Sequence, residues 1–392
     1  MDRKKVCIVG MGPAGLMAGT ILLEQGFEVH LFDHKKAAGR KFLVAGNGGF
    51  NLTHSEISET FVEKYNRPYL QAAFQQFDNQ EWINWLSKIG IETFVGSSGK
   101  IFPVKGIKPI EVLSAWIKRI EELGGIFHFS HKLADFNEKE VVFTQKSSNI
   151  SHFYDFLVLA MGGASWKKTG STGEWNNILE ANGVDCKPFE ASNSGFELKD
   201  WSEIAQLQGQ TIKNIEVTFN ATSKKGDIVI STYGMEGTPI YFVNKEYRKD
   251  PQGCFSIDFK PTKTREEIKE VLANAKNITG GLKKLNVSPV SIQLIKLRTS
   301  KEEYSSPGIL AEIIKGMKFY PSSLRPIDEV ISTVGGISME AITKDFQLKC
   351  YDKVFVCGEM LDWDAPTGGY LIQGCVSSGY KAAMSISTLI KG

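Results

Sequence analysis

Short apolar runs alternate with amphipathic segments at the start of the chain and predict a βαβ unit. Residues 6–10 form an uninterrupted apolar run that ends in glycine, which is typical of a strand buried in a parallel sheet. Residues 13–26 place apolar side chains at helical spacing and end in glycine, and residues 29–33 form a second buried strand. A strand, a helix and a strand within about 30 residues are typical of a right-handed βαβ crossover.

The pattern changes along the chain and predicts two domains. Further helices and strands of an α/β domain are expected at about 59–75, 79–89, 108–123, 126–129, 138–144 and 153–160. Short alternating runs favour antiparallel strands at 213–219, 227–232 and 240–243, with helices at 264–275 and about 289–298. An apolar strand returns at 354–357, and 370–390 has the pattern of a closing helix. We therefore predict a Rossmann-like α/β domain with a parallel sheet, built from residues 1–190 and 326–392. It is interrupted by a mostly β, partly helical domain at 191–325 that would cover the cofactor or shape a substrate cleft.

Composition narrows the function classes. Lys and Arg number 46 against 44 Asp and Glu, which argues against a nucleic-acid partner or a polybasic membrane contact. The first apolar run is too short for a secretory signal, and no stretch of about 18 apolar residues occurs. We expect a cytoplasmic protein. The six cysteines form no C-x-x-C pair, so we expect neither a disulfide framework nor a structural metal.

The first chemical motif is a glycine triplet between the first strand and the first helix. Gly10 allows a tight turn, Gly12 lets the backbone approach a diphosphate, and Gly15 lets helix and strand pack closely. The helix N-terminus offers free N–H groups and the positive end of its dipole. Asp33 ends the second strand, where a carboxylate accepts hydrogen bonds from ribose hydroxyls. Together these features predict a dinucleotide site.

Two later glycine motifs follow buried strands. The strand ending at Ala160 runs into Gly162, and the strand at 354–357 leads to Gly358 and Glu359. A second helix N-terminus begins near Gly369. A helix N-terminus aimed at a flavin stabilises the negative charge of the reduced ring, and a nicotinamide enzyme has no such requirement.

The Gly-rich segment 39–54 is too long and too rich in glycine for a plain connection. Arg40 and Lys41 suit a phosphate or the flavin oxygens, while Asn47 and Asn51 suit hydrogen bonds to a flat heterocycle.

Together these motifs resemble the FAD-dependent flavoproteins of the aminoacetone-oxidase or BaiN type, which belong to the two-dinucleotide-binding-domain flavoproteins. The resemblance covers nearly the whole chain, in the stretches 8–15, 39–42, 51–54, 162–165, 169–173, 333–337, 358–362 and 368–370. It implies an FAD domain split by an insertion, with FAD bound non-covalently. It also implies that Leu133 contacts the adenine and that Glu359, Asp362, Gly369, Tyr370 and Leu371 lie near the flavin.

Pattern and resemblance together give one set of predicted FAD-binding residues. The set is Gly10, Gly12, Pro13, Ala14, Gly15, Asp33, His34, Arg40, Lys41, Asn51, Leu133, Ala160, Gly162, Gly358, Glu359, Asp362, Gly369, Tyr370 and Leu371. No metal ligand is predicted.

Two departures from the family pattern limit what the resemblance implies. Many members carry Cys just before the loop asparagine, where this chain has Phe50, so a cysteine-dependent step is excluded there. Residues 50–56, Phe-Asn-Leu-Thr-His-Ser-Glu, indicate a distinct subgroup, so the resemblance by itself does not identify the substrate. Leu371 and Ile372 also replace the Asn-Leu often found after Gly-Gly-Tyr.

The predicted function is an FAD-dependent oxidoreductase that transfers hydride through flavin N5 to or from a small molecule. Lys41, His54, Glu359 and Tyr370 are candidates for proton transfer, but no catalytic residue is assigned. With no second glycine triplet in a βαβ unit, any NAD(P)H would bind transiently in an open cleft. Two alternatives stay open: an NAD-dependent dehydrogenase that uses only the first triplet, and a flavin-bound sensor or RNA-modification partner without metabolic turnover.

Overall fold

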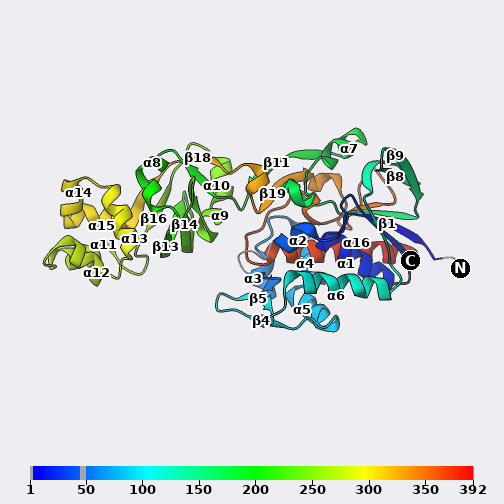
Figure 1. The fold of residues 1–392 in the computed structure, drawn as a ribbon, viewed down its shortest axis with the longest axis horizontal. Helices are drawn as coiled ribbons and strands as arrows, with labels where there is room; N and C mark the ends of the chain where they lie inside the picture. Colours follow the sequence, from blue (N-terminus) through cyan, green and yellow to red (C-terminus); the bar gives the residue numbers. More distant parts are fainter. Residues whose placement is uncertain (1–2, 45–49, 392) are drawn as a thin grey trace. The chain divides into compact units, whose positions relative to one another are not determined.

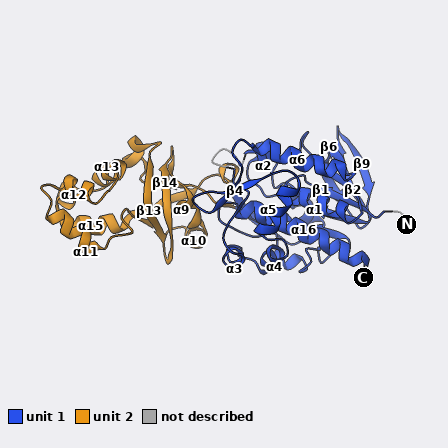
Figure 2. Cartoon of the chain, turned by 90° about the horizontal axis from the view of Figure 1, so that it is seen from below, with its two compact units in different colours: residues 1–190, 332–392 blue, residues 191–331 orange. Residues whose placement is uncertain are grey.

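The computed structural model describes residues 3–44 and 50–391, and these fall into two compact units (Figure 2). Unit 1 contains residues 1–190 and 332–392, and unit 2 contains residues 191–331. In unit 2, β18 (Pro321–Leu324) pairs with β12 (Phe196–Leu198). The second boundary between the units lies at 331 instead of 325 because the chain after β18 stays bound to unit 2: the Arg325 N–H donates to the Gly195 carbonyl and the Ile331 N–H to the Asn193 carbonyl. No helix among the described residues has the length and apolar character needed to cross a bilayer.

Unit 1 is organised around a five-stranded parallel sheet in the order β20-β10-β1-β2-β6. Its strands are Val354–Val356 (β20), Phe156–Leu159 (β10), Lys5–Val9 (β1), Glu28–Asp33 (β2) and Ile126–Phe129 (β6). Nearly all side chains of the central strands are buried, as expected for a sheet covered on both faces. The predicted α/β class with a parallel Rossmann-like sheet is confirmed.

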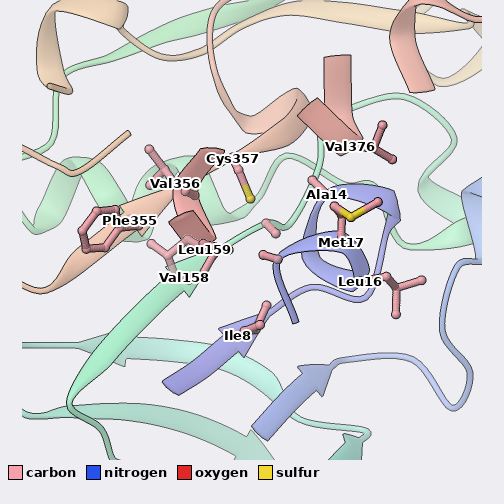
Figure 3. Packing of buried hydrophobic residues seen from close by; sticks show 14 of the residues in the cluster. Ile8, Ala14, Leu16, Met17, Val158, Leu159, Phe355, Val356, Cys357 and Val376 are labelled. Atoms are coloured by element: carbon pink, nitrogen blue, oxygen red, sulfur yellow. The ribbon is translucent and has the colours of Figure 1, made fainter. Parts of the chain in front are cut away.

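Two helices, α1 (Pro13–Glu24) and α16 (Tyr370–Lys391), pack against each other, and α1 also packs against the central strands. Pro13 suits the first turn of α1, and Gly26 at φ +90° follows its end. A Cβ atom on Gly379 of α16 would lie 2.2 Å from the Ala14 carbonyl oxygen, so the helices cross at a position that only glycine allows. Figure 3 shows Ile8, Leu159 and Val356 of three adjacent strands gathered with side chains of both helices.

The remaining elements of unit 1 surround this layer (Figure 1). The helices are α2 (Arg40–Val44), α3 (Ser58–Val62), α4 (Pro68–Gln76), α5 (Asn79–Lys88), α6 (Pro109–Glu122) and α7 (Trp175–Ala181). Three small sheets contain β3 (Thr53–His54) with β4 (Thr93–Val95) and β5 (Lys100–Pro103), β7 (Lys132–Phe136) with β8 (Glu140–Gln145) and β9 (Ser148–Phe153), and β11 (Cys186–Ser192) with β19 (Ser332–Ile337).

Some sequence expectations for unit 1 need correction. The helix expected over 59–75 is two helices, because Arg67 is extended before Pro68. The segment 39–54 is not loop throughout, since residues 40–44 form α2. Residues 45–49, and Asn47 with them, lie outside the described residues.

Unit 2 has its own core and a seven-stranded antiparallel sheet in the order β17-β16-β13-β14-β15-β12-β18. Its other strands are β13 (Thr211–Phe219), β14 (Thr222–Ile230), β15 (Gly234–Glu236), β16 (Phe255–Asp258) and β17 (Met317–Phe319). Its helices are α8 (Trp201–Ile204), α9 (Thr238–Phe242), α10 (Asn244–Lys249), α11 (Arg265–Ala273), α12 (Ile278–Lys284), α13 (Pro289–Leu297), α14 (Lys301–Ser305) and α15 (Pro307–Gly316). The strand expected at 240–243 is wrong: Pro239 in the first turn starts helix α9 there instead.

Candidate functional site

A cavity of about 670 Å³ opens at the carboxyl edge of the parallel sheet in unit 1. β1, β2 and β10 each end at it, which is where open α/β sheets bind ligands. Of the predicted residues, those lining the cavity are Gly10, Gly12, Pro13, Ala14, Asp33, His34, Arg40, Lys41, Leu133, Ala160, Gly162, Gly358 and Glu359. The sheet edge therefore brings together residues from six separate stretches of the chain.

Gly10 and Gly12 of the glycine triplet line the cavity, and each glycine of the triplet has its own geometry. A Cβ on Gly10 (φ +106°) would lie 2.2 Å from the Ala160 carbonyl oxygen, and one on Gly15 would lie 2.0 Å from that of Gly10. Close packing of strand and helix thus requires both residues. Apart from its two chain neighbours, a Cβ on Gly12 would meet no atom of the described residues within 4 Å, so none of their contacts explains this glycine. Gly12 lines the cavity, and its missing side chain keeps the N-terminus of α1 open to a ligand.

Asp33 is fixed over this turn by the backbone. Its Oδ2 accepts a hydrogen bond from the Met11 N–H at 3.1 Å, and its Oδ1 accepts one from the Lys35 N–H at 2.8 Å. Each carboxylate oxygen retains a lone pair that can accept from a hydroxyl in the cavity. The adjacent His34 has a lowered pKa because burial outweighs the attraction of Asp33, which favours a neutral imidazole.

Apolar and aromatic groups line the cavity beyond Asp33. Phe32, His131 and Leu133 come from the ends of β2 and the start of β7, and Trp175 of α7 lines the cavity as well. The Trp175 indole donates to the Gly162 carbonyl at 3.0 Å, which ties the second glycine turn to α7. A flat heterocycle suits such a wall, since apolar surfaces with a few polar groups are typical of ligand pockets.

Lys41 of α2 and Glu359 of the short helix at Gly358–Met360 meet in the cavity. The Lys41 Nζ lies 2.8 Å from Glu359 Oε2 and donates to Ser165 Oγ at 2.7 Å. Gly358 (φ +78°) packs against Ala14, where a Cβ would lie 2.8 Å from the Ala14 Cβ. The carboxy-terminal glycine motif thus reaches the start of α1, as the sequence pattern predicts.

Asp362 does not line the cavity but sits in an ion-pair cluster. Arg67 pairs with its carboxylate and donates to its carbonyl at 2.8 Å, and Lys187 lies 2.9 Å from Oδ2. Its Oδ1 accepts from the Gly335 N–H at 3.1 Å. With its oxygens held by these groups, Asp362 joins β19 to the segment after β20.

The start of α16 lies against β3 and is likewise outside the cavity lining. A Cβ on Gly369 would lie 2.5 Å from the Thr53 backbone, and the Tyr370 ring stacks on His54 at 5.3 Å between centroids. Burial, with a smaller effect of Glu56, raises the pKa of the Tyr370 hydroxyl far above its ordinary value. Gly15, Asn51 and Leu371 also lie outside the lining.

Sequence reasoning missed two hydroxyl groups that organise this site. Ser165 holds Lys41, and the Thr333 Oγ1 accepts from the Ala164 N–H at 3.2 Å. Both lie in stretches that carry the family resemblance, which is the one signal that could have pointed to them.

The sequence and the fold of this chain are similar to those of several known proteins. The chain is 24% identical to the ribosomal RNA dihydrouridine synthase of Haemophilus influenzae, over 97% of this chain and 98% of that protein. It is 19% identical to the 3-dehydro-bile acid delta(4,6)-reductase of Clostridium scindens, over 96% and 98% of the two chains. The fold resembles that of the 3-ketosteroid-delta4-(5alpha)-dehydrogenase of Rhodococcus jostii, with a TM-score of 0.53, 13% identity, and coverage of 98% of this chain and 97% of that one.

The family comparison covers almost the whole chain. Residues 4–385 match the model described as the HI0933-like protein Rossmann domain. This match confirms the resemblance inferred from the glycine motifs. The chain belongs to the HI0933-like family of Rossmann-domain proteins.

Proposed function

We propose that this chain is an FAD-dependent oxidoreductase whose cofactor occupies the cavity of unit 1. The observation that carries the proposal is the open space at Gly12, next to the Asp33 carboxylate that the turn itself holds in place. Glycines at 10 and 15 are explained by packing within the protein, whereas glycine at 12 is explained by the close approach of a ligand. The residues present therefore fit a dinucleotide.

Each end of the cavity suits one part of FAD. The amides at the start of α1 would hold the diphosphate, because the first N–H groups of a helix have no intrahelical partner and Gly12 has no side chain to cap them. Asp33 would accept from the adenosine ribose, and Leu133 would lie against the adenine. Lys41 and Glu359 would lie toward the isoalloxazine end.

When bound, FAD supplies hydride transfer through its N5 atom, and the protein supplies orientation and electrostatics. Glu359 and Ser165 hold the Lys41 ammonium, which keeps a positive charge at a defined position in the cavity. Burial, together with Glu359, raises the pKa of Cys375 in the cavity lining to about 12. That thiol therefore stays protonated at neutral pH and is not a nucleophile.

The names of the relatives support a substrate class. Dihydrouridine differs from uridine by two hydrogens on a C–C bond conjugated to a ring carbonyl. A 3-dehydro-bile acid delta(4,6)-reductase acts, by its name, on double bonds in conjugation with a 3-oxo group. We infer that this chain reduces, or forms, a carbon–carbon double bond conjugated to a carbonyl.

The absorption spectrum of the purified protein tests the cofactor. Flavin bands and retention of FAD on gel filtration are expected, whereas a colourless protein that takes up no FAD would falsify the proposal. Titration with NADH against FAD, read by fluorescence, separates it from an NAD-dependent dehydrogenase.

Anaerobic turnover tests the reaction. The holoenzyme, reduced by dithionite or a nicotinamide, is expected to be reoxidised by an unsaturated carbonyl compound such as a 3-oxo-Δ4 steroid or a uridine-containing RNA. Saturated analogues are the control. A stable FAD complex that no such acceptor reoxidises would favour the sensor alternative.

A further inference from the structure

One segment of unit 2 carries positive charge without any compensating acid. Between residues 271 and 301 the chain has six basic residues and no Asp or Glu, although the whole chain has a net charge of only +2. The basic residues are Lys276, Lys283, Lys284, Lys296, Arg298 and Lys301. The nearly neutral total therefore conceals a local excess on the segment that contains α12 and α13.

Tyr304 brings these helices to one surface. Its hydroxyl hydrogen-bonds the Thr279 hydroxyl of α12 at 2.9 Å, and the Lys296 ammonium of α13 lies 5.5 Å from the centre of its ring. Lys283 follows Thr279 by four positions, so both lie on one face of α12. Lys276 lies two residues before the first residue of α12. We call Lys276, Lys283, Lys284 and Lys296, the four exposed lysines on or next to α12 and α13, the basic surface.

The lysines of the basic surface are free to bind an external anion. All four are exposed, and among the described residues none of them has a carboxylate within ion-pair distance. Arg298 differs, because Asp200 and Glu203 neutralise it. At the start of α14, Glu303 caps its own helix by accepting from the Ser300 N–H, and among the described residues no ion pair joins Glu302 to a lysine of the basic surface.

We propose that the basic surface binds the phosphate backbone of an RNA substrate. The inference rests on the proposed function, because uracil carries the conjugated double bond inferred there, and it assigns the substrate to RNA. Unpaired lysines match a phosphate chain, which binds through charge and without sequence readout. A bilayer fits less well, since Leu282, Leu285 and Ile295 are buried, and Leu297, at 37% exposed, is a single apolar residue beside the lysines and not an apolar stripe.

The test compares two fourfold variants of the full-length holoenzyme. The first, K276Q/K283Q/K284Q/K296Q, removes the charge of the basic surface. The matched control, K88Q/K105Q/K139Q/K146Q, removes four exposed lysines of unit 1 that likewise have no ion-pair partner among the described residues. Circular dichroism and FAD content check that both variants fold and load.

The readout is fluorescence anisotropy with an in vitro-transcribed ribosomal RNA fragment between 50 and 300 mM salt. The wild type is expected to bind with a steep salt dependence. The first variant is expected to bind at least about tenfold more weakly at 100 mM salt, with the slope of log K against log salt reduced by roughly 2–3. The control variant should keep the affinity and slope of the wild type.

Turnover of a 3-oxo-Δ4 steroid separates this proposal from the proposed function. Equal RNA binding by both variants overturns the basic surface as an RNA site, even where steroid reduction proceeds. Selective loss of RNA binding in the first variant supports it, even where no reductase activity is found. Loss of binding to phosphatidylserine vesicles in the first variant, without loss of RNA binding, assigns the surface to a membrane and overturns the proposal.

Discussion

The ammonium of Lys41 lies 2.8 Å from the carboxylate of Glu359, although 318 positions separate the two residues in the sequence. The first belongs to α2 and the second to the turn after β20, and both line the same cavity. The pair is mostly shielded, with 28% and 13% of the two side chains exposed. Its charges therefore act on a bound anion with less screening than a surface pair would.

The two members of this pair should have unequal effects on FAD binding. Lys41→Met leaves the Glu359 carboxylate uncompensated beside an anionic cofactor, whereas Glu359→Gln leaves a cation there. We expect the first variant to raise the Kd for FAD about 10–100-fold, and the second to change it by less than about threefold. Quenching of flavin fluorescence on titration measures both values.

The double variant Lys41→Met/Glu359→Gln provides the control for charge. It removes the uncompensated carboxylate and should recover most of the lost affinity, because the loss comes from repulsion. Equal losses in the two single variants would show instead that the pair acts only through its geometry.

Gly12 and Gly15 should respond in opposite ways to the same substitution. A Cβ at Gly15 would lie 2.0 Å from the Gly10 carbonyl oxygen, so Gly15→Ala should lower the free energy of unfolding of the apoprotein by about 1–3 kcal/mol. A Cβ at Gly12 meets only open space, so Gly12→Ala should leave the stability of the apoprotein within about 0.5 kcal/mol of wild type.

For FAD affinity we expect Gly12→Ala to be the more damaging of the two substitutions. The Gly12 methyl group would occupy the approach to the helix N-terminus, so Gly12→Ala should weaken FAD binding at least about tenfold. Urea unfolding of the apoprotein and FAD titration give the two quantities. A Gly12→Ala protein that binds FAD like wild type would place the diphosphate elsewhere.

Asp33→Asn tests the carboxylate over the turn. Both oxygens accept backbone N–H groups, so an amide presents an NH₂ group to one of these donors. We expect affinity for FAD and for ADP to fall together, about 10–100-fold. Asp155→Asn is the matched control, because Asp155 accepts the Lys5 N–H at 2.8 Å but does not line the cavity. A similar loss in both variants would contradict a specific role for Asp33.

Local patterns were enough to predict which residues gather at the carboxyl edge of the parallel sheet. Gly10, Gly12 and Asp33 lie within one βαβ unit, whose strand and helix periods fix where their backbone meets the cavity. Glu359 was also predicted, because a buried strand must deliver the next residues to the same sheet edge. These predictions depend on short-range structure that the chain encodes directly.

Contacts between distant segments could not be predicted in the same way. Asp362, which is predicted to lie beside the flavin, also forms ion pairs with Arg67 and Lys187, and no local pattern pairs residues so far apart. The helix α9 was read as a strand because four apolar residues in a row fit either structure, and Pro239 decided the outcome. Tyr370 stacks on His54 through a packing choice that only the tertiary fold specifies.

Four of the six histidines form a cluster with Phe32 beneath the cavity wall, and this cluster should make the protein sensitive to acid. His30 stacks on His128 and is hydrogen-bonded to Glu28, while His128, His131 and His152 lie within ring-contact distance of one another. Burial, with neighbouring histidines, lowers the pKa of His128 to about 4 and also lowers the pKa of His152. The folded state therefore keeps both rings neutral in a range where the unfolded chain protonates them at about 6.5.

The free energy of unfolding should accordingly be highest above pH 6.5 and should fall as the pH drops from about 6.5 toward 4, because the unfolded chain binds more protons there.

The variant His152→Phe tests this pH dependence directly. The buried His152 Nε2 has no hydrogen-bond partner, and a phenyl ring keeps the edge contacts with Phe32 and Phe143. We expect the variant to match or exceed the wild-type melting temperature at pH 7.5 and to lose a few degrees less than wild type on transfer to pH 5. Thermal unfolding followed by circular dichroism at the two pH values gives both differences. Parallel losses in the two proteins would mean that His152 titrates alike in the folded and unfolded states, and acid sensitivity would then have to arise from His128 or from groups outside the cluster.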